Sequence, residues 1–204
     1  MIKLAYLDEE TGWQSTFFYT FSQKYDLIIP EVLPKNVNDI WENVKDSQIV
    51  VTDFRLNGSG MLSYTGDDVA KVIHKHNKHL PVLVITSYEN NAVQECEETK
   101  IIRDKDMFSK PAGLEVFRNI IDTAVNIYDK KKVEAERIIK EYQSLIAEGK
   151  ALSPQDEAAR FDAELYISEL DLDSSARANL ISSGSAKDLK EILGLAQTIV
   201  SKYK

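Results

Sequence analysis

Four short segments in the first 110 residues each lead into a polar or charged side chain. If these segments are parallel strands of one sheet, their carboxyl ends meet at one edge, where an open α/β sheet places its site. A group of carboxylates, a hydroxyl and a lysine at that edge indicates Mg²⁺ and phosphoryl chemistry on Asp53. The segments are 2–7, 49–51, 81–85 and 106–109, and the side chains that follow are Asp8, Glu9 and Glu10, then Asp53, Thr86 and Lys110.

Helical patterns separate these segments. We predict helices at 12–24, 37–44 with Asn36 as its N-cap, 67–77 and 90–98, and a further strand at 27–29. Strands that alternate with helices favour a parallel sheet covered on both faces. We therefore expect an α/β fold with a flavodoxin-like, doubly wound sheet of five parallel strands in the order 2-1-3-4-5.

The motifs around the four polar positions resemble the receiver domain of two-component response regulators. They are L-D-E-E with Asp8 and Glu9, V-T-D-F-R-L with Asp53, V-I-T-S with Thr86, and F-S-K-P with Lys110, and the resemblance covers residues 1–125. It implies that Asp53 accepts a phosphoryl group from a histidine kinase or phosphotransfer protein. Asp53 and Glu9 would bind Mg²⁺ directly, Asp8 through water, and Arg55 through its backbone carbonyl. Lys110 would pair with Asp53, and Thr86 would bond to a phosphoryl oxygen.

Three positions depart from the family pattern. The loop at 57–66 is longer than usual, and it is either a lid over Asp53 or a flexible insertion that costs little entropy. Arg55 lies where side chains influence the access of water to the phosphorylated carboxylate. Met107 stands where the family carries an aromatic switch residue, with Phe108 expected on the opposite face of the strand.

The sequence pattern predicts helices throughout the second part, 126–204. Apolar residues spaced alternately by four and three, Ile138 among them, predict one long helix over 113–148. Its apolar stripe either forms a parallel coiled-coil dimer or packs against the chain's own later helices. Three shorter helices follow, the first capped by Ser153 with Pro154 in its first turn. We expect a small all-α domain that binds an unidentified protein partner. The alternatives are DNA binding by the last two helices, with Lys187 and Lys190, and a scaffold with a degenerate receiver.

Composition narrows these choices. The net charge of −8 argues against nucleic acid as a partner of the chain as a whole, because a polyanion attracts basic surfaces. Cys96 is the single cysteine, and no apolar run is long enough to span a membrane, so we expect a cytoplasmic protein. We expect no enzymatic output beyond self-catalysed phosphotransfer and autodephosphorylation. His74, His76 and His79 are not expected to converge on a metal.

Overall fold

The computed structural model describes residues 1–87 and 102–170. The chain forms two compact units, Met1–Lys130 and Lys131–Lys204, whereas we placed the division after residue 125. The predicted helix at 90–98 and the helices expected beyond residue 170, with Lys187 and Lys190, lie outside the described residues. In the part that is described, none of the helices is long and apolar enough to cross a membrane.

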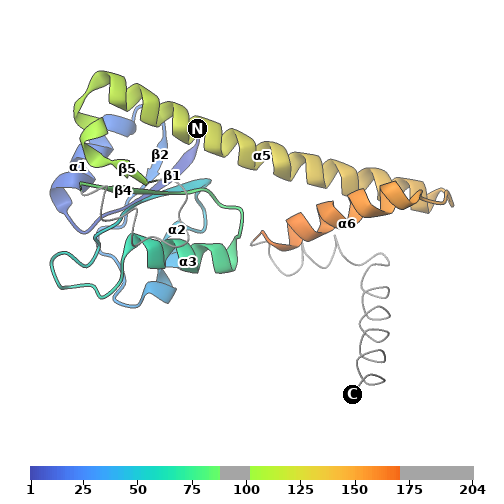
Figure 1. Ribbon diagram of the computed structural model, residues 1–204, viewed down its shortest axis with the longest axis horizontal. Coiled ribbons are helices and arrows are strands. Elements are labelled where there is room, and N and C mark those ends of the chain that lie inside the picture. Colours follow the sequence, from blue (N-terminus) through green and yellow to red (C-terminus); the bar gives the residue numbers. More distant parts are fainter. Residues whose placement is uncertain (88–101, 171–204) are drawn as a thin grey trace, which may run out of the picture. The chain divides into compact units, whose positions relative to one another are not determined.

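A five-stranded parallel sheet forms the centre of the first unit, in the order β2-β1-β3-β4-β5 (Figure 1). This confirms the predicted fold class. The register pairs Leu7 with Thr52, Asp53 with Ile85, and Thr86 with Asp104, so the carboxyl ends of four strands meet at one edge. The strands are β1 (Lys3–Leu7), β2 (Asp26–Ile28), β3 (Ile49–Asp53), β4 (Val82–Thr86) and β5 (Ile102–Asp104).

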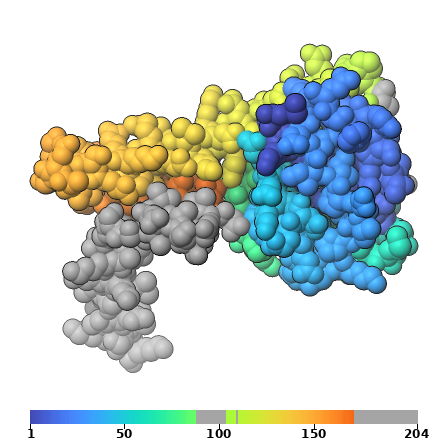
Figure 2. Space-filling view, turned by 180° about the vertical axis from the view of Figure 1, so that it is seen from behind, coloured from blue at the N-terminus to red at the C-terminus, as the bar shows by residue number. Residues whose placement is uncertain are grey.

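Helices cover both faces of this sheet (Figure 1). Successive residues of a strand point to opposite faces, and β1 accordingly sends Leu4 and Tyr6 into one core and Ala5 and Leu7 into the other. The Tyr6 core contains α1 (Thr11–Phe21) and the start of α5 (Pro111–Ala147). The opposite core contains the 3-10 helix η1 (Val37–Ile40), α2 (Trp41–Val44) and α3 (Gly66–His76). Residues from the start of the chain, in blue, form much of the visible face of this unit in Figure 2.

Local sequence signals set several of these boundaries. The Asn36 side chain accepts a hydrogen bond from the Asn38 N–H and caps η1, as predicted. Thr65 and Asp68 form a capping box at the start of α3. Gly66 follows directly, and a Cβ there would lie 2.3 Å from the carbonyl oxygen of Asp53. Only glycine therefore allows α3 to begin so close to the strand that carries Asp53.

The segment at 106–109 is not a strand, contrary to our prediction. The strand β5 ends at Asp104, and Lys105–Ser109 form a 3-10 helix, η2. Asp104 caps η2 by accepting a hydrogen bond from the Asp106 N–H at 2.9 Å. Phe108 is buried in the Tyr6 core, where its ring contacts the rings of Phe17 and Phe117 edge-on. The residues that we assigned to a strand therefore belong to a short 3-10 helix.

Helix α5 confirms the long helix predicted over 113–148. In the first unit its residues Phe117, Ile121 and Val125 belong to the Tyr6 core. The first half of the predicted apolar stripe thus packs with residues of the sheet and α1, and neither predicted alternative describes this half. Asp122 reinforces this packing, since it accepts hydrogen bonds from Lys24 Nζ at 2.5 Å and from the Tyr25 hydroxyl at 2.8 Å.

The second unit contains the end of α5 and helix α6 (Pro154–Ser168). Ser153 and Asp156 form a capping box with Pro154 in the first turn, which confirms the predicted start of this helix. The Tyr142 hydroxyl of α5 donates to Asp156 Oδ1 at 3.3 Å. Among the isoleucines of α5 in this unit, Ile139 is the buried one, whereas the predicted apolar stripe contained the neighbouring Ile138.

Candidate functional site

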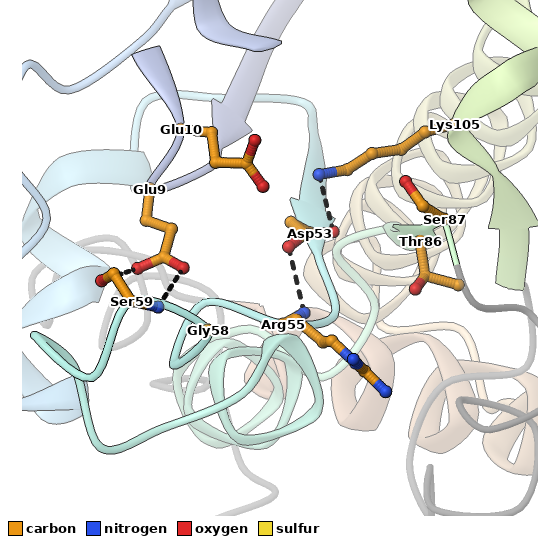
Figure 3. A pocket seen from close by; sticks show the side chains of 9 residues that line it. All are labelled: Glu9, Glu10, Asp53, Arg55, Gly58, Ser59, Thr86, Ser87 and Lys105. Atoms are coloured by element: carbon orange, nitrogen blue, oxygen red, sulfur yellow. Dashed lines mark hydrogen bonds and ion pairs between the residues drawn. The ribbon is translucent and has the colours of Figure 1, made fainter. Parts of the chain in front are cut away.

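A pocket of about 360 Å³ opens at the carboxyl edge of the sheet (Figure 3). We predicted acids, a hydroxyl and a lysine at this edge, and residues of these types line the pocket. Three of the predicted residues, Glu9, Asp53 and Thr86, line the pocket together with Arg55. The complete lining is Glu9, Glu10, Asp53, Arg55, Gly58, Ser59, Thr86, Ser87 and Lys105.

Asp53 ends β3 and is only 4% exposed. One carboxylate oxygen, Oδ2, accepts the backbone N–H of Arg55 at 3.1 Å, and the other, Oδ1, lies 2.9 Å from Lys105 Nζ. Burial raises the pKa of Asp53 above its ordinary value, Lys105 opposes this effect, and the nearby Asp8 carboxylate adds to it. The ammonium of Lys105 therefore has to offset the cost of keeping this carboxylate charged.

The lysine that pairs with Asp53 is Lys105, and our prediction of Lys110 is wrong. Lys105 Nζ lies 2.9 Å from both Asp53 Oδ1 and Asp8 Oδ2, and the residue is 2% exposed. Burial by itself lowers the pKa of Lys105, but the two carboxylates reverse this and raise it above its usual value. Lys110 follows η2 and is exposed. Because β5 ends earlier than predicted, the residue directly after the strand is Lys105.

Asp8 is completely buried and already makes several polar contacts. Its Oδ2 accepts from the Tyr6 hydroxyl at 2.5 Å and from Lys105, while Oδ1 accepts the Glu10 N–H at 2.9 Å. Burial, followed by the charge of Asp8, raises the pKa of Tyr6, so its hydroxyl stays protonated and donates. Asp8 and Asp53 therefore bind the same ammonium group.

The carboxylates of Glu9 and Glu10 point in different directions (Figure 3). Both oxygens of Glu9 accept hydrogen bonds from Ser59, Oε1 from the N–H at 2.8 Å and Oε2 from the hydroxyl. Figure 3 shows the Glu9 carboxylate directed to Ser59, while that of Glu10 is directed into the pocket. From the sequence we assigned Glu10 no role in metal binding, although it lines the same pocket as Asp53.

The hydroxyl positions lie on the other side of Asp53 (Figure 3). Thr86 ends β4 and is buried, and Ser87 follows it at the exposed rim. Thr86 is therefore placed at the pocket as predicted, since β4 pairs in register with the strand that carries Asp53. The Arg55 side chain also lines the pocket, which places it close to the predicted phosphorylation site.

Oxygen atoms dominate the groups that could hold a cation. The carboxylates of Asp53, Glu9 and Glu10 suit a hard divalent ion such as Mg²⁺. Within residues 1–87 and 102–170, however, no three acidic or histidine side chains converge as a ready-made metal site. Glu9 is turned to Ser59, and Lys105 lies between Asp8 and Asp53. The residue types fit the ion, and Glu9 would have to leave Ser59 to reach it.

Two of the histidines considered in the sequence, His74 and His76, lie on α3. His74 Nε2 lies 3.2 Å from the carbonyl oxygen of Leu80, and the His76 ring stacks on Trp41 at 5.0 Å between ring centroids. Each of these two side chains therefore has a structural partner.

No protein-family model and no curated protein matches the chain. Solved structures with a similar fold include a response regulator receiver domain from Clostridium thermocellum, which is 16% identical, with 63% of this chain and 98% of that chain covered and a TM-score of 0.48. The receiver domain of HemR from Leptospira biflexa is 20% identical, with 61% and 94% covered and a TM-score of 0.42. A complex of the response regulator RcsB with DNA is 14% identical, with 90% and 98% covered and a TM-score of 0.41. All three are response regulators or receiver domains, the family that the sequence motifs indicated.

Proposed function

We propose that the protein is a phosphorylation-dependent signalling protein whose first unit accepts a phosphoryl group on Asp53. The observation that carries this proposal is the buried Asp53 carboxylate, held at the end of β3 by Lys105 and by the Arg55 N–H. A carboxylate kept charged beside a single lysine is suited to act as a nucleophile. The expected donor is a histidine kinase or a phosphotransfer protein.

The chain's own residues have distinct tasks in this transfer. A carboxylate oxygen of Asp53 forms a bond to phosphorus as the bond from phosphorus to the donor histidine nitrogen breaks, and that nitrogen keeps the electron pair. Lys105, already 2.9 Å from Asp53, balances the added negative charge. Mg²⁺, held by Asp53, Glu9 or Glu10 and the Arg55 carbonyl, would neutralise the remaining charge when bound. Thr86 at the end of β4 would donate its hydroxyl to a phosphoryl oxygen.

This proposal is tested by incubating the full chain with acetyl phosphate and Mg²⁺ and locating the modification by mass spectrometry. We expect one added phosphoryl group on the peptide that contains Asp53, and none in Asp53→Asn. Asp46→Asn is the matched control, because Asp46 is an exposed carboxylate outside the pocket. Equal modification of Asp53→Asn and wild type would refute the assignment of Asp53.

Thr86 provides a separate test of the response that follows transfer. We expect Thr86→Ala to be phosphorylated at close to the wild-type rate, because Asp53 and Lys105 are retained. Its amide exchange should change less on phosphorylation than that of wild type, because a hydrogen bond from β4 is lost. An identical change in exchange in both proteins would remove Thr86 from the switching role.

The proposed output is protein binding by the helical second unit. Helix α6 carries more acidic than basic side chains, so its described surface does not favour a polyanion. DNA binding, which the RcsB complex shows for that protein, remains the alternative output for this chain. A filter-binding titration of the phosphorylated protein with duplex DNA at several salt concentrations distinguishes them, because DNA binding weakens steeply as salt is added.

A further inference from the structure

The inserted loop, residues 57–65, contacts the predicted metal ligands directly. Ser59 donates its N–H to Glu9 Oε1 at 2.8 Å and its hydroxyl to Glu9 Oε2, so both carboxylate oxygens are engaged by one residue. Figure 3 shows that these bonds turn the Glu9 carboxylate to the loop rather than to Asp53. The loop therefore holds the acid that the motif assigned to direct metal binding.

The same loop engages a second expected ligand. The Gly58 N–H donates to the carbonyl oxygen of Arg55 at 3.1 Å. A Cβ on Gly58 would lie 2.9 Å from Glu9 Oε1 and 3.3 Å from that carbonyl oxygen. Glycine at this position thus allows the backbone to lie against both groups at once. Glu9 and the Arg55 carbonyl are both occupied by adjacent residues of one turn.

The far end of the loop is anchored separately. Tyr64 is buried, and its hydroxyl donates to the carbonyl oxygen of Pro34 at 2.6 Å. Gly60, with φ of +76°, forms a bend between the two ends, and Met61 beside it is exposed. The part near Ser59 can therefore be released from Glu9 while Tyr64 keeps the loop attached to the core.

We infer that the 57–65 loop is a metal-sensitive latch in which Ser59 holds Glu9 away from Asp53 until a divalent cation draws Glu9 into the pocket. This inference rests on the proposed function, because it concerns the cation used at the same site. A carboxylate that binds the cation gives up hydrogen bonds to Ser59, so cation binding and loop docking compete for Glu9. Binding of Mg²⁺ should therefore release the segment around Ser59.

The first measurement is hydrogen–deuterium exchange of the full chain with and without Mg²⁺. We expect the peptide spanning 57–62 to exchange faster when Mg²⁺ is bound, because the Ser59 N–H loses its acceptor. A peptide from α3 should not change, since its amides are bonded within the helix. Calorimetric titration of the same sample with Mg²⁺ establishes independently that the ion is bound.

Substitution of Ser59 tests the competition itself. Ser59→Ala removes the hydroxyl donor, and we expect Mg²⁺ to bind about tenfold more tightly, as the loss of one competing hydrogen bond to a carboxylate predicts. Gly58→Ala should act in the same direction by pushing Glu9 off the loop. Ser63→Ala is the matched control, because Ser63 is an exposed serine of the same loop. It should bind Mg²⁺ as wild type does.

The outcomes separate the latch from the proposed function. Tighter Mg²⁺ binding by Ser59→Ala, together with faster exchange of 57–62 in metal-bound wild type, supports the latch. Metal binding that leaves this peptide equally protected, with unchanged affinity in Ser59→Ala, overturns the latch and leaves phosphorylation of Asp53 intact. Failure of wild type and Ser59→Ala alike to bind Mg²⁺ overturns both the latch and the metal requirement.

Discussion

Removal of the Lys105 ammonium should destabilise the first unit far more than removal of any exposed lysine. Its Nζ lies 2.9 Å from two carboxylate oxygens, and the side chains of Lys105, Asp8 and Asp53 are 3%, 0% and 6% exposed. Lys105→Met keeps the apolar length of the side chain and leaves two buried carboxylates without a cation. Loss of one partner of a buried pair costs about 3 to 5 kcal/mol.

The loss of stability caused by Lys105→Met should become smaller as the pH falls. Burial raises the pKa of Asp53, and loss of Lys105 removes the main opposing effect. Between the ordinary carboxyl pKa and this raised value, the folded chain binds more protons than the unfolded chain. Stability must then increase as pH falls through that window, by up to about 1.4 kcal/mol per pH unit for one proton. The defect of Lys105→Met should therefore shrink at acidic pH.

Urea unfolding followed by tryptophan fluorescence measures this effect. The chain has two tryptophans, Trp13 and Trp41, and both lie in the first unit. Lys110→Met is the matched control, and it should change the free energy of unfolding by less than about 0.5 kcal/mol. Equal effects of the two substitutions, or a Lys105→Met defect that grows as pH falls, would refute the buried triad of Asp8, Lys105 and Asp53.

Three further substitutions test other parts of the structure. Gly66→Ala should cost about 3 kcal/mol in urea unfolding, because its Cβ would lie 2.3 Å from the Asp53 carbonyl oxygen, whereas Gly12→Ala, with open space around it, should be neutral or stabilising. Tyr6→Phe removes the donor to Asp8 and should cost about 1 to 3 kcal/mol, while the exposed Tyr19→Phe should cost nothing measurable; equal values would exclude the buried bond. Ile139→Asp should reduce helical circular dichroism while the tryptophan fluorescence stays native, and Ile146→Asp, at a partly exposed site of the same helix, should have little effect. Loss of both signals in Ile139→Asp would show that the two units do not fold separately.

The sequence contained enough information to locate β1, β3 and β4 and to place Asp53 at a strand end, because these three strands are apolar and lead into distinct polar residues. The lysine was assigned wrongly for a physical reason. The F-S-K-P motif places Lys110 in a familiar local context, but β5 is three residues long and ends at Asp104. The short apolar pair at 101–102, followed shortly by Lys105, was the signal that could have identified the correct residue.

For the long helix α5, the sequence predicted the secondary structure but not the packing partner. Its spacing of apolar residues correctly predicted a continuous helix, since spacing reports the period of the chain. The same spacing does not identify what covers the apolar face, and Phe117, Ile121 and Val125 are covered by the chain's own sheet and α1. Likewise, no local pattern linked Ser59 to Glu9, because that contact joins residues 50 positions apart in the sequence.

The contacts of α5 with the sheet unit reach as far as Gln48, which donates to Asp129 at 3.0 Å, and Asn77, which donates to the Tyr128 hydroxyl at 3.0 Å. Both bonds would be lost if the chain were cut after residue 125, but both would survive a cut after Lys130. Three consecutive lysines, Lys130 to Lys132, provide trypsin with sites at this point. Genetic recombination within the same codons could exchange the remainder of the chain for another module and leave the unit that carries Asp53 structurally whole.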